Sequence, residues 1–256
     1  MNSNAGVTNN ASDDPPRPDP DCPQCRGLGS VRQEVPLGHA NFGKLASCPV
    51  CMSGSLARWK SRQTISAMMA TSGLSADEYN GSLDDILERG EGSREMIATA
   101  KEIVVGRRYF LTLWGGSGNG KTRALVIMVG HFLRRGESAI YSRLSNLLNH
   151  LRDGYNPDDN FRTSDRYRQI VECRFLAIDE PEKVKLTDWA REVWFNVVDD
   201  RYLAAKRRER ATAIAMNDDP ETLPAYVLSR LRYDLHSDTG FAIVHNTDPD
   251  GRESGL

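Results

Sequence analysis

One loop in the middle of the chain has the composition of a phosphate-binding loop. Residues 113–122 read Leu-Trp-Gly-Gly-Ser-Gly-Asn-Gly-Lys-Thr and complete the pattern G-x-x-x-x-G-K-T. Glycines at these positions let backbone N–H groups turn towards phosphate oxygens, and the N-terminus of a following helix adds positive charge. Outside a strand–loop–helix context, the same stretch would be only a glycine-rich turn. The predicted ATP contacts are Gly115, Gly116, Ser117, Gly118, Asn119, Gly120, Lys121, Thr122 and Arg123.

Two adjacent acids supply the second half of such a site. The hydrophobic stretch 175–178 ends in Asp179 and Glu180, which is typical of a Walker B element. Asp179 and the Thr122 hydroxyl would hold Mg²⁺, while Lys121 would reach the β- and γ-phosphates. Glu180 would orient and deprotonate the attacking water. The alternative interpretation is an ordinary strand followed by an acidic loop.

Two further polar residues are candidates for the catalytic set. Asn217 follows the apolar stretch 212–216 and is placed to contact the γ-phosphate or the attacking water. It could equally form a turn ahead of Pro220, because asparagine favours turns. Arg230 lies in a predicted short helix, 223–232. In an oligomer it could stabilise transition-state charge on a neighbour's γ-phosphate, or it could belong to a solvated basic face.

Four cysteines near the N-terminus have the spacing of a metal site. Two C-x₂-C pairs, Cys22 with Cys25 and Cys48 with Cys51, are separated by twenty-two residues. Four thiolates close a structural zinc site and leave no open position for catalysis. A module of about thirty residues has little core, so the metal would supply much of its folding free energy. Free or redox-active thiols are the alternative.

Composition excludes several classes of protein. The 256 residues carry 33 Lys and Arg against 35 Asp and Glu, a formal net charge of −2. Any nucleic-acid contact must therefore use a local basic patch. No apolar run approaches the ~20 residues that span a bilayer, and no signal peptide is evident. We expect a cytoplasmic protein without membrane contact, where cysteines favour metal over disulfides.

The elements that must position these groups alternate between strand and helix. Residues 109–114 suit a buried strand, and a helix begins at Lys121. Further strands are predicted at 138–142, 175–179, 212–216 and 241–245, and further helices at 93–105, 143–152, 188–205 and 223–232. Such alternation indicates an α/β fold in which helices flank a parallel sheet. Ser93 is the predicted N-cap of the helix 93–105.

Changes in composition along the chain predict its domain organisation. The first residues are rich in Asn, Ser, Asp and Pro, which predicts a disordered tail. The predicted segments are a disordered tail at 1–21, a zinc-binding module at 22–52, a helical connector at 53–92 and an ATPase domain at 93–256. Within the connector we predict helical pieces at 56–69 and 82–88.

The order of these motifs resembles that of the AAA+ ATPases. Within them it is similar to the DnaC/DnaI-like helicase loaders and their IstB-like relatives, which help transposition. The resemblance covers about residues 22–246, and includes the segment 179–202 and the sequence Ser-Arg-Leu-Arg at 229–232. It implies a P-loop AAA+ sheet without a C-terminal lid, a sensor role for Asn217 and an arginine-finger role for Arg230. The chain departs from the family at 181–182, where Pro-Glu replaces an apolar residue and glycine.

The resemblance also implies partners and a function. A loader would use ATP to place a hexameric replicative helicase on single-stranded DNA when replication begins, in a bacterial or phage-infected cell. Its weak or partner-stimulated hydrolysis would occur in an oligomer bridged by ATP. An IstB-like helper of DNA transposition and a monomeric P-loop ATPase or kinase are the competing classes. Basic clusters at 107–108, 134–135 and 206–210 are candidate DNA contacts, although helix C-termini also favour Lys and Arg.

Overall fold

The chain forms two compact units, residues 1–66 and 67–256. The computed structural model describes residues 17–33, 35–36, 39, 42–52, 72–75, 78–153, 164–233 and 240–251. The predicted helix over residues 56–69 and most of the predicted tail lie outside these residues. Within the described parts, no helix has both the length and the hydrophobicity needed to cross a membrane.

The N-terminal unit is a small hairpin with cysteines at its centre. Strand β1 (Ser30–Arg32) pairs antiparallel with β2 (Leu45–Ser47). Among the described residues of this unit, the buried side chains are those of Cys22, Cys25, Cys48 and Met52. Two strands of three residues are too short to be stable by themselves in water, so the hairpin needs further stabilisation from the residues packed around it.

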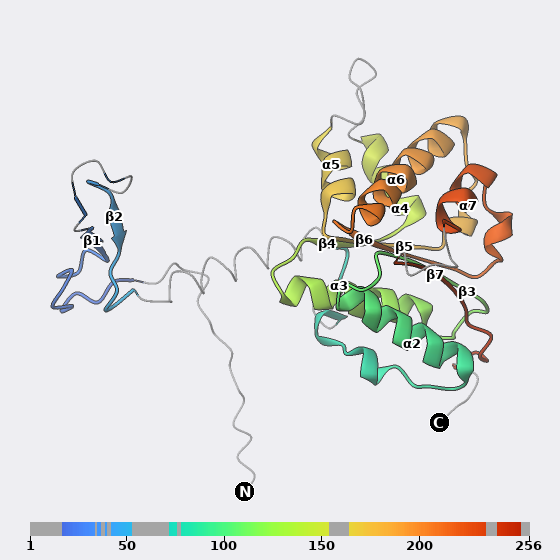
Figure 1. Cartoon of the computed structure of the whole chain (residues 1–256), viewed down its shortest axis with the longest axis horizontal. Coiled ribbons are helices and arrows are strands. Elements are labelled where there is room, and N and C mark those ends of the chain that lie inside the picture. Colours follow the sequence, from blue (N-terminus) through green and yellow to red (C-terminus); the bar gives the residue numbers. More distant parts are fainter. Residues whose placement is uncertain are drawn as a thin grey trace, which may run out of the picture. The chain divides into compact units, whose positions relative to one another are not determined.

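The second unit contains a parallel five-stranded sheet (Figure 1). Its strands are β3 (Phe110–Trp114), β4 (Ala139–Arg143), β5 (Phe175–Asp179), β6 (Ala211–Met216) and β7 (Phe241–His245), in the spatial order β4-β5-β6-β3-β7. Parallel strands bring their carboxyl ends to one edge of the sheet. The predicted phosphate loop, acidic pair and Asn217 all follow carboxyl ends, and they therefore meet at that edge.

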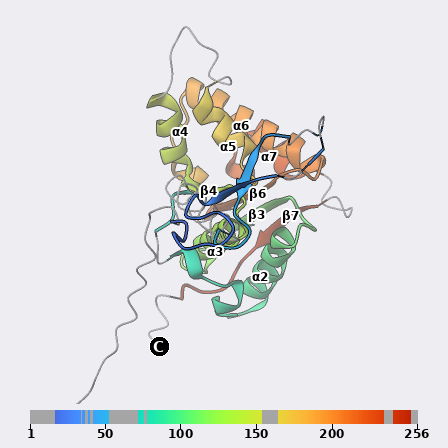
Figure 2. The ribbon, with the colours of Figure 1, turned by 90° about the vertical axis from the view of Figure 1, so that its left-hand side faces the viewer.

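Helices cover both faces of the sheet (Figures 1 and 2). One face carries α2 (Glu91–Val104) and α3 (Lys121–Arg134), and the other carries α4 (Leu144–Asp153), α5 (Asp165–Glu172), α6 (Asp188–Lys206) and α7 (Ala225–Leu231). Short 3₁₀ turns lie at η1 (Glu78–Asn80), η2 (Leu83–Asp85), η4 (Pro181–Lys183) and η5 (Pro220–Thr222). This architecture confirms the predicted α/β fold of the P-loop AAA+ type.

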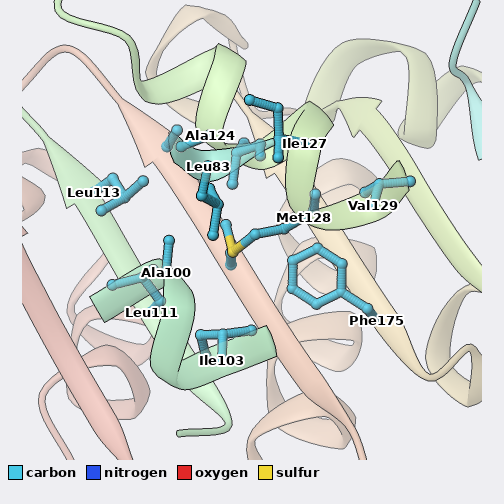
Figure 3. Close-up of a cluster of buried hydrophobic side chains, with 14 of the residues drawn as sticks. Leu83, Ala100, Ile103, Leu111, Leu113, Ala124, Ile127, Met128, Val129 and Phe175 are labelled. Atoms are coloured by element: carbon cyan, nitrogen blue, oxygen red, sulfur yellow. The ribbon is translucent and has the colours of Figure 1, made fainter. Parts of the chain in front are cut away.

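Two hydrophobic clusters, one on each face, hold the sheet in place. In Figure 3, Leu111 and Leu113 of β3 meet Ala100 of α2 and Met128 of α3. Phe110, the neighbour of Leu111 along β3, belongs to the cluster on the opposite face. Successive residues of a strand point to opposite faces, so a strand buried on both sides must be apolar throughout, as the stretch 109–114 suggested.

Two local predictions are wrong. Helix α2 begins at Glu91 with Gly90 as its N-cap, so Ser93 lies inside the first turn. There its hydroxyl oxygen accepts from the backbone N–H groups of Arg89 (2.8 Å) and Gly90 (3.2 Å), which is the reciprocal half of a capping box. The predicted helix 82–88 is only the turn η2, because Ile86 already adopts an extended conformation.

Candidate functional site

The loop and the acidic residues line one cavity of about 620 Å³ at the carboxyl edge of the sheet. Its wall includes Ser117, Gly118, Asn119, Gly120, Lys121, Thr122, Arg123, Asp179, Glu180, Lys183 and Asn217. A larger cavity of about 970 Å³ runs along β4, at the edge of the sheet, and also touches Thr122. The structure thus brings together most of the predicted ATP contacts and three of the four predicted catalytic residues.

Lys121 is folded back onto its own loop. Its Nζ donates to the carbonyl oxygens of Gly115 (2.7 Å) and Gly116 (2.6 Å) and to Oδ1 of Asn119 (2.9 Å). The residue is only 5 % exposed. Burial lowers the pKa of the Lys121 ammonium to about 8, against the attraction of Asp179 and Glu182. A phosphate oxygen would replace these weaker acceptors and strengthen the charge-assisted contact.

The back of the phosphate loop is fixed by a residue that sequence reasoning missed. Asn119 donates from Nδ2 to the carbonyl oxygen of Asn246 (2.8 Å), and Asn246 donates from Nδ2 to the carbonyl oxygen of Asn119 (3.0 Å). Both residues are buried. Gly115 has a φ of +131°, and a Cβ there would clash with the Asn246 carbonyl oxygen. Only glycine permits this approach.

Asp179 receives two hydroxyl groups on one oxygen. The Thr122 hydroxyl donates to its Oδ2 at 2.8 Å, and the Tyr141 hydroxyl donates to the same atom at 2.9 Å. Burial and the adjacent Asp179 charge raise the pKa of Tyr141. Carboxylate and hydroxyl oxygens are the ligands that Mg²⁺ prefers, so Thr122 and Asp179 fit the predicted metal role.

Glu180 lies in a turn of unusual backbone geometry. Its φ of 53° is in the left-handed region, which costs free energy for a residue with a Cβ. Its carboxylate contacts Arg143 at the end of β4 (3.2 Å) and also pairs with Lys183. Pro181 then opens η4, and Glu182 turns towards Asn217 instead. Both residues at 181–182 thus take part in the turn that follows β5.

Arg230 lies outside this cavity, on α7. Its Nε donates to Oδ1 of Asp199 on α6 at 2.7 Å. The guanidinium group also lies over the rings of Tyr202 (5.1 Å) and Phe195 (5.9 Å). It is therefore held on the surface formed by α6 and α7.

The four cysteines of the N-terminal unit form one cluster. The Sγ atoms of Cys22 and Cys48 are 3.7 Å apart, those of Cys25 and Cys51 are 3.4 Å apart, and all four lie within 4.8 Å of one another. Four thiolates around zinc at about 2.3 Å would have sulfurs about 3.8 Å apart. Backbone N–H groups of Cys25 and Gln24 lower the pKa of the Cys22 thiol to about 7. The cluster thus fits a zinc ion.

Basic clusters at 107–108, 134–135 and 206–210 lie at the amino edge of the sheet, away from the phosphate loop. Each lies at or just after the end of a helix and precedes a strand. Several of their arginines pair with acids, such as Arg108 with Glu102 and Arg207 with Glu209. This placement matches the preference of helix C-termini for cations.

The fold and the cavity together define a P-loop ATP-binding domain of the AAA+ type. The sequence model of the family described as "IstB-like ATP binding protein" matches residues 56–214, more than half of the chain. The chain belongs to this family of IstB-like ATP-binding proteins. A comparison with curated proteins finds no match.

Several solved structures are similar in fold. DnaA from Aquifex aeolicus bound to AMPPCP is 21 % identical with a TM-score of 0.52, and the match covers 66 % of this chain and 50 % of that one. The chain thus spans about half the length of DnaA. DnaI (18 % identity, TM-score 0.53) and the DnaC helicase loader (18 %, 0.51) are matched over 72 % and 68 % of this chain and over 98 % and 100 % of their own. At these identities the likeness is one of fold alone.

Proposed function

We propose that this protein uses ATP to load a hexameric replicative helicase onto single-stranded DNA. The observation that carries the proposal is the extent of the match to DnaI and to the DnaC helicase loader, whose solved chains are covered almost completely. A DnaA structure described as bound to AMPPCP and single-stranded DNA has a similar fold. The cysteine cluster, which precedes the ATPase unit in the sequence, is a candidate element for docking on the helicase.

The cavity residues suit ATP hydrolysis. Lys121 would leave its loop carbonyls to neutralise the β- and γ-phosphates, while Thr122 and Asp179 would hold Mg²⁺, which supplies charge neutralisation when bound. Glu180 would leave Arg143 to accept a proton from the attacking water. Because Glu180 is held by an ion pair, activation would require a change in the turn after β5.

Arg230 would act on the ATP of a neighbouring subunit. Its contacts with Asp199 and with aromatic rings hold it on the α6–α7 surface, where a second copy could reach it. A mixing experiment tests this: Arg230→Ala subunits have an intact cavity and Glu180→Gln subunits have an intact Arg230. Recovered ATPase activity in the mixture supports action across an interface. A mixture no more active than its two components, together with wild-type activity independent of concentration, contradicts it.

The N-terminal unit would hold one structural zinc ion and dock on the helicase. Four sulfurs at tetrahedral spacing motivate the metal assignment. Metal analysis of the full chain should give about one zinc per chain, since a four-thiolate site is closed. Cys48→Ser should lose the zinc and the helicase contact but keep ATP binding. A folded N-terminal unit without metal would contradict the assignment.

The second candidate function is that of an IstB-like helper of DNA transposition, which the family match favours. Affinity purification from the native cell with Glu180→Gln, expected to hold ATP without hydrolysing it, separates the two functions. Recovery of a hexameric helicase supports the loader. Recovery of a transposase instead supports the helper and contradicts the loader. Lys121→Ala is the matched control, because a partner captured only in the ATP state should be lost.

A further inference from the structure

Two acids of one turn reach to opposite sides of their strand. Strand β5 lies between β4 and β6 in the sheet. From the turn that follows β5, Glu180 contacts Arg143 at the end of β4, and Glu182 contacts Asn217 after β6. Pro181 begins η4 between them, and its fixed φ limits the conformations of this turn. The turn therefore links the carboxyl ends of three adjacent strands.

One oxygen of Glu182 binds both N–H groups that Asn217 presents to it. Its Oε1 accepts from the backbone nitrogen of Asn217 at 3.0 Å and from the side-chain Nδ2 at 3.1 Å. A carboxylate only accepts hydrogen bonds, so the amide nitrogen of Asn217 must face it. The Asn217 Oδ1 and the second N–H of Nδ2 are left to serve the nucleotide cavity, which Asn217 lines.

The other carboxylate oxygen of Glu182 is not used in holding Asn217. Its Oε2 is buried and has no hydrogen-bond partner among the described residues. A buried carboxylate oxygen without a partner destabilises a fold, so the two hydrogen bonds that Oε1 accepts are kept at a cost in stability. Glu182 is also close enough to Lys121 to stabilise its charged form. The turn thus retains a costly group beside the catalytic cavity.

We propose that Glu182 is a positioning residue that holds Asn217 in the orientation needed for ATP hydrolysis. The inference rests on the proposed ATPase function and assigns Asn217 a partner within its own chain. Glu182 does not touch the nucleotide in this account. It fixes the direction of the Asn217 amide, and through it the geometry at the γ-phosphate.

The test compares the full-length wild type with Glu182→Ala and Glu182→Gln. Without Glu182 the Asn217 amide can rotate, and a small misplacement of a catalytic group can cost up to about 10²-fold in rate. We expect Glu182→Ala to lower kcat about tenfold or more and to raise KM for ATP by no more than about threefold, because Lys121 and the N–H groups of the loop still bind the phosphates. Glu182→Gln keeps the acceptor oxygen and should retain most of the activity. The matched control is Glu95→Ala, an exposed glutamate of α2.

A double-mutant cycle with Asn217→Ala separates positioning from general destabilisation. If Glu182 acts through Asn217, adding Glu182→Ala to Asn217→Ala should cause no further loss of kcat. A purely structural role would lower the melting temperature of all backgrounds and give additive effects. If Glu182→Ala does not fold, Glu182→Asp serves instead, since its side chain is one methylene too short to reach both N–H groups.

A binding measurement keeps the inference testable even if hydrolysis is slow. Asn217 faces the γ-phosphate in this account, so Glu182→Ala should lower the affinity for AMPPCP relative to ADP. An unchanged kcat and an unchanged AMPPCP-to-ADP ratio would overturn the positioning role while leaving the proposed function intact. Equal loss in Glu182→Gln and Glu182→Ala would also overturn it, because the charge and not the hydrogen bonds would then matter. A wild type that binds no nucleotide would overturn both.

Discussion

The two halves of the candidate ATP site are held by different kinds of contact. Lys121, in the phosphate loop, is 5 % exposed and donates to three oxygens of its own loop. Glu180, in the turn after β5, pairs instead with Arg143 and Lys183, whose side chains are 59 % and 57 % exposed. Lys121 is therefore fixed by buried hydrogen bonds, and Glu180 by partly solvated ion pairs.

The difference indicates which half can move at low cost. Solvent-exposed ion pairs contribute only about 0.2–1 kcal/mol each. Leaving a buried polar group without its partner costs about 1–3 kcal/mol. The loop is thus preorganised for binding phosphate, whereas Glu180 can exchange its partners at low cost when nucleotide binds. Mutations in the loop should affect binding, and mutations in the turn should affect hydrolysis.

The largest expected effect is on hydrolysis, in Glu180→Gln. A carboxamide cannot accept a proton from water at neutral pH, and general-base catalysis contributes about 10²–10⁴-fold. We expect the rate of phosphate release to fall by that factor while ATP affinity stays close to that of the wild type. Equilibrium titration beside a phosphate-release assay measures both. Glu192→Ala, at an exposed position of α6, should change neither, and normal hydrolysis by Glu180→Gln would remove Glu180 from the base role.

Lys121→Ala should show the opposite pattern. It removes a charged donor to phosphate, and a hydrogen bond to a charged group is worth about 1.5–3 kcal/mol. ATP affinity should therefore fall about ten- to a hundredfold, as titration with a fluorescent ATP analogue can show. Lys185→Ala removes an exposed lysine of the loop after η4 and serves as the control. Undiminished affinity in Lys121→Ala would contradict the loop assignment.

Much of the fold could be predicted because its signals are local. The strand 175–179 and the strand 241–245 have their predicted bounds, since continuous apolar runs bounded by polar residues suit strands buried on both faces. The start of α2 was misplaced because Ser93 has the side chain of an N-cap. The capping of α2 is instead completed by Asp248, which accepts a hydrogen bond from the Ser93 backbone N–H and lies 155 residues away in the sequence.

The candidate site could be predicted only in part, because only some of its residues belong to local sequence motifs. The pattern 115–122 and the pair Asp179 and Glu180 are contiguous motifs. Asn246 has no local motif, because its role depends on the meeting of β7 with the loop after β3. Arg143 and Tyr141 reach the acids only because β4 lies beside β5. Glu182 did carry a signal, its departure from the family pattern, although the sequence did not reveal its partner.

Asn246→Ala tests whether the hydrogen bonds between Asn246 and Asn119 fix the phosphate loop. The substitution leaves the Asn119 carbonyl oxygen without its donor, and such a loss costs about 1–3 kcal/mol. We expect ATP and ADP affinity to fall together by roughly tenfold, with kcat at saturation little changed. Thr247→Ala, at the exposed neighbouring position, is the control. Asp248→Ala removes the hydrogen bond from the Ser93 backbone N–H of α2. It should lower the melting temperature without this loss of affinity.

The smallest predicted effect comes from pH and concerns the ammonium group of Lys121. The pKa of Lys121 is lowered to about 8, so its charged fraction falls from about nine-tenths at pH 7 to about a quarter at pH 8.5. If only the ammonium form binds phosphate, ATP affinity should fall about fourfold over that interval. Lys121→Arg should remove the dependence, because a guanidinium group stays charged.

The pH dependence of stability should have the opposite sign. An unfolded lysine titrates near pH 10.4, so between about pH 8 and 10.4 the unfolded chain binds more protons, and the Lys121 contribution to the free energy of unfolding rises with pH. Affinity that is constant up to pH 9 would show that the loop does not hold Lys121 in a desolvated state.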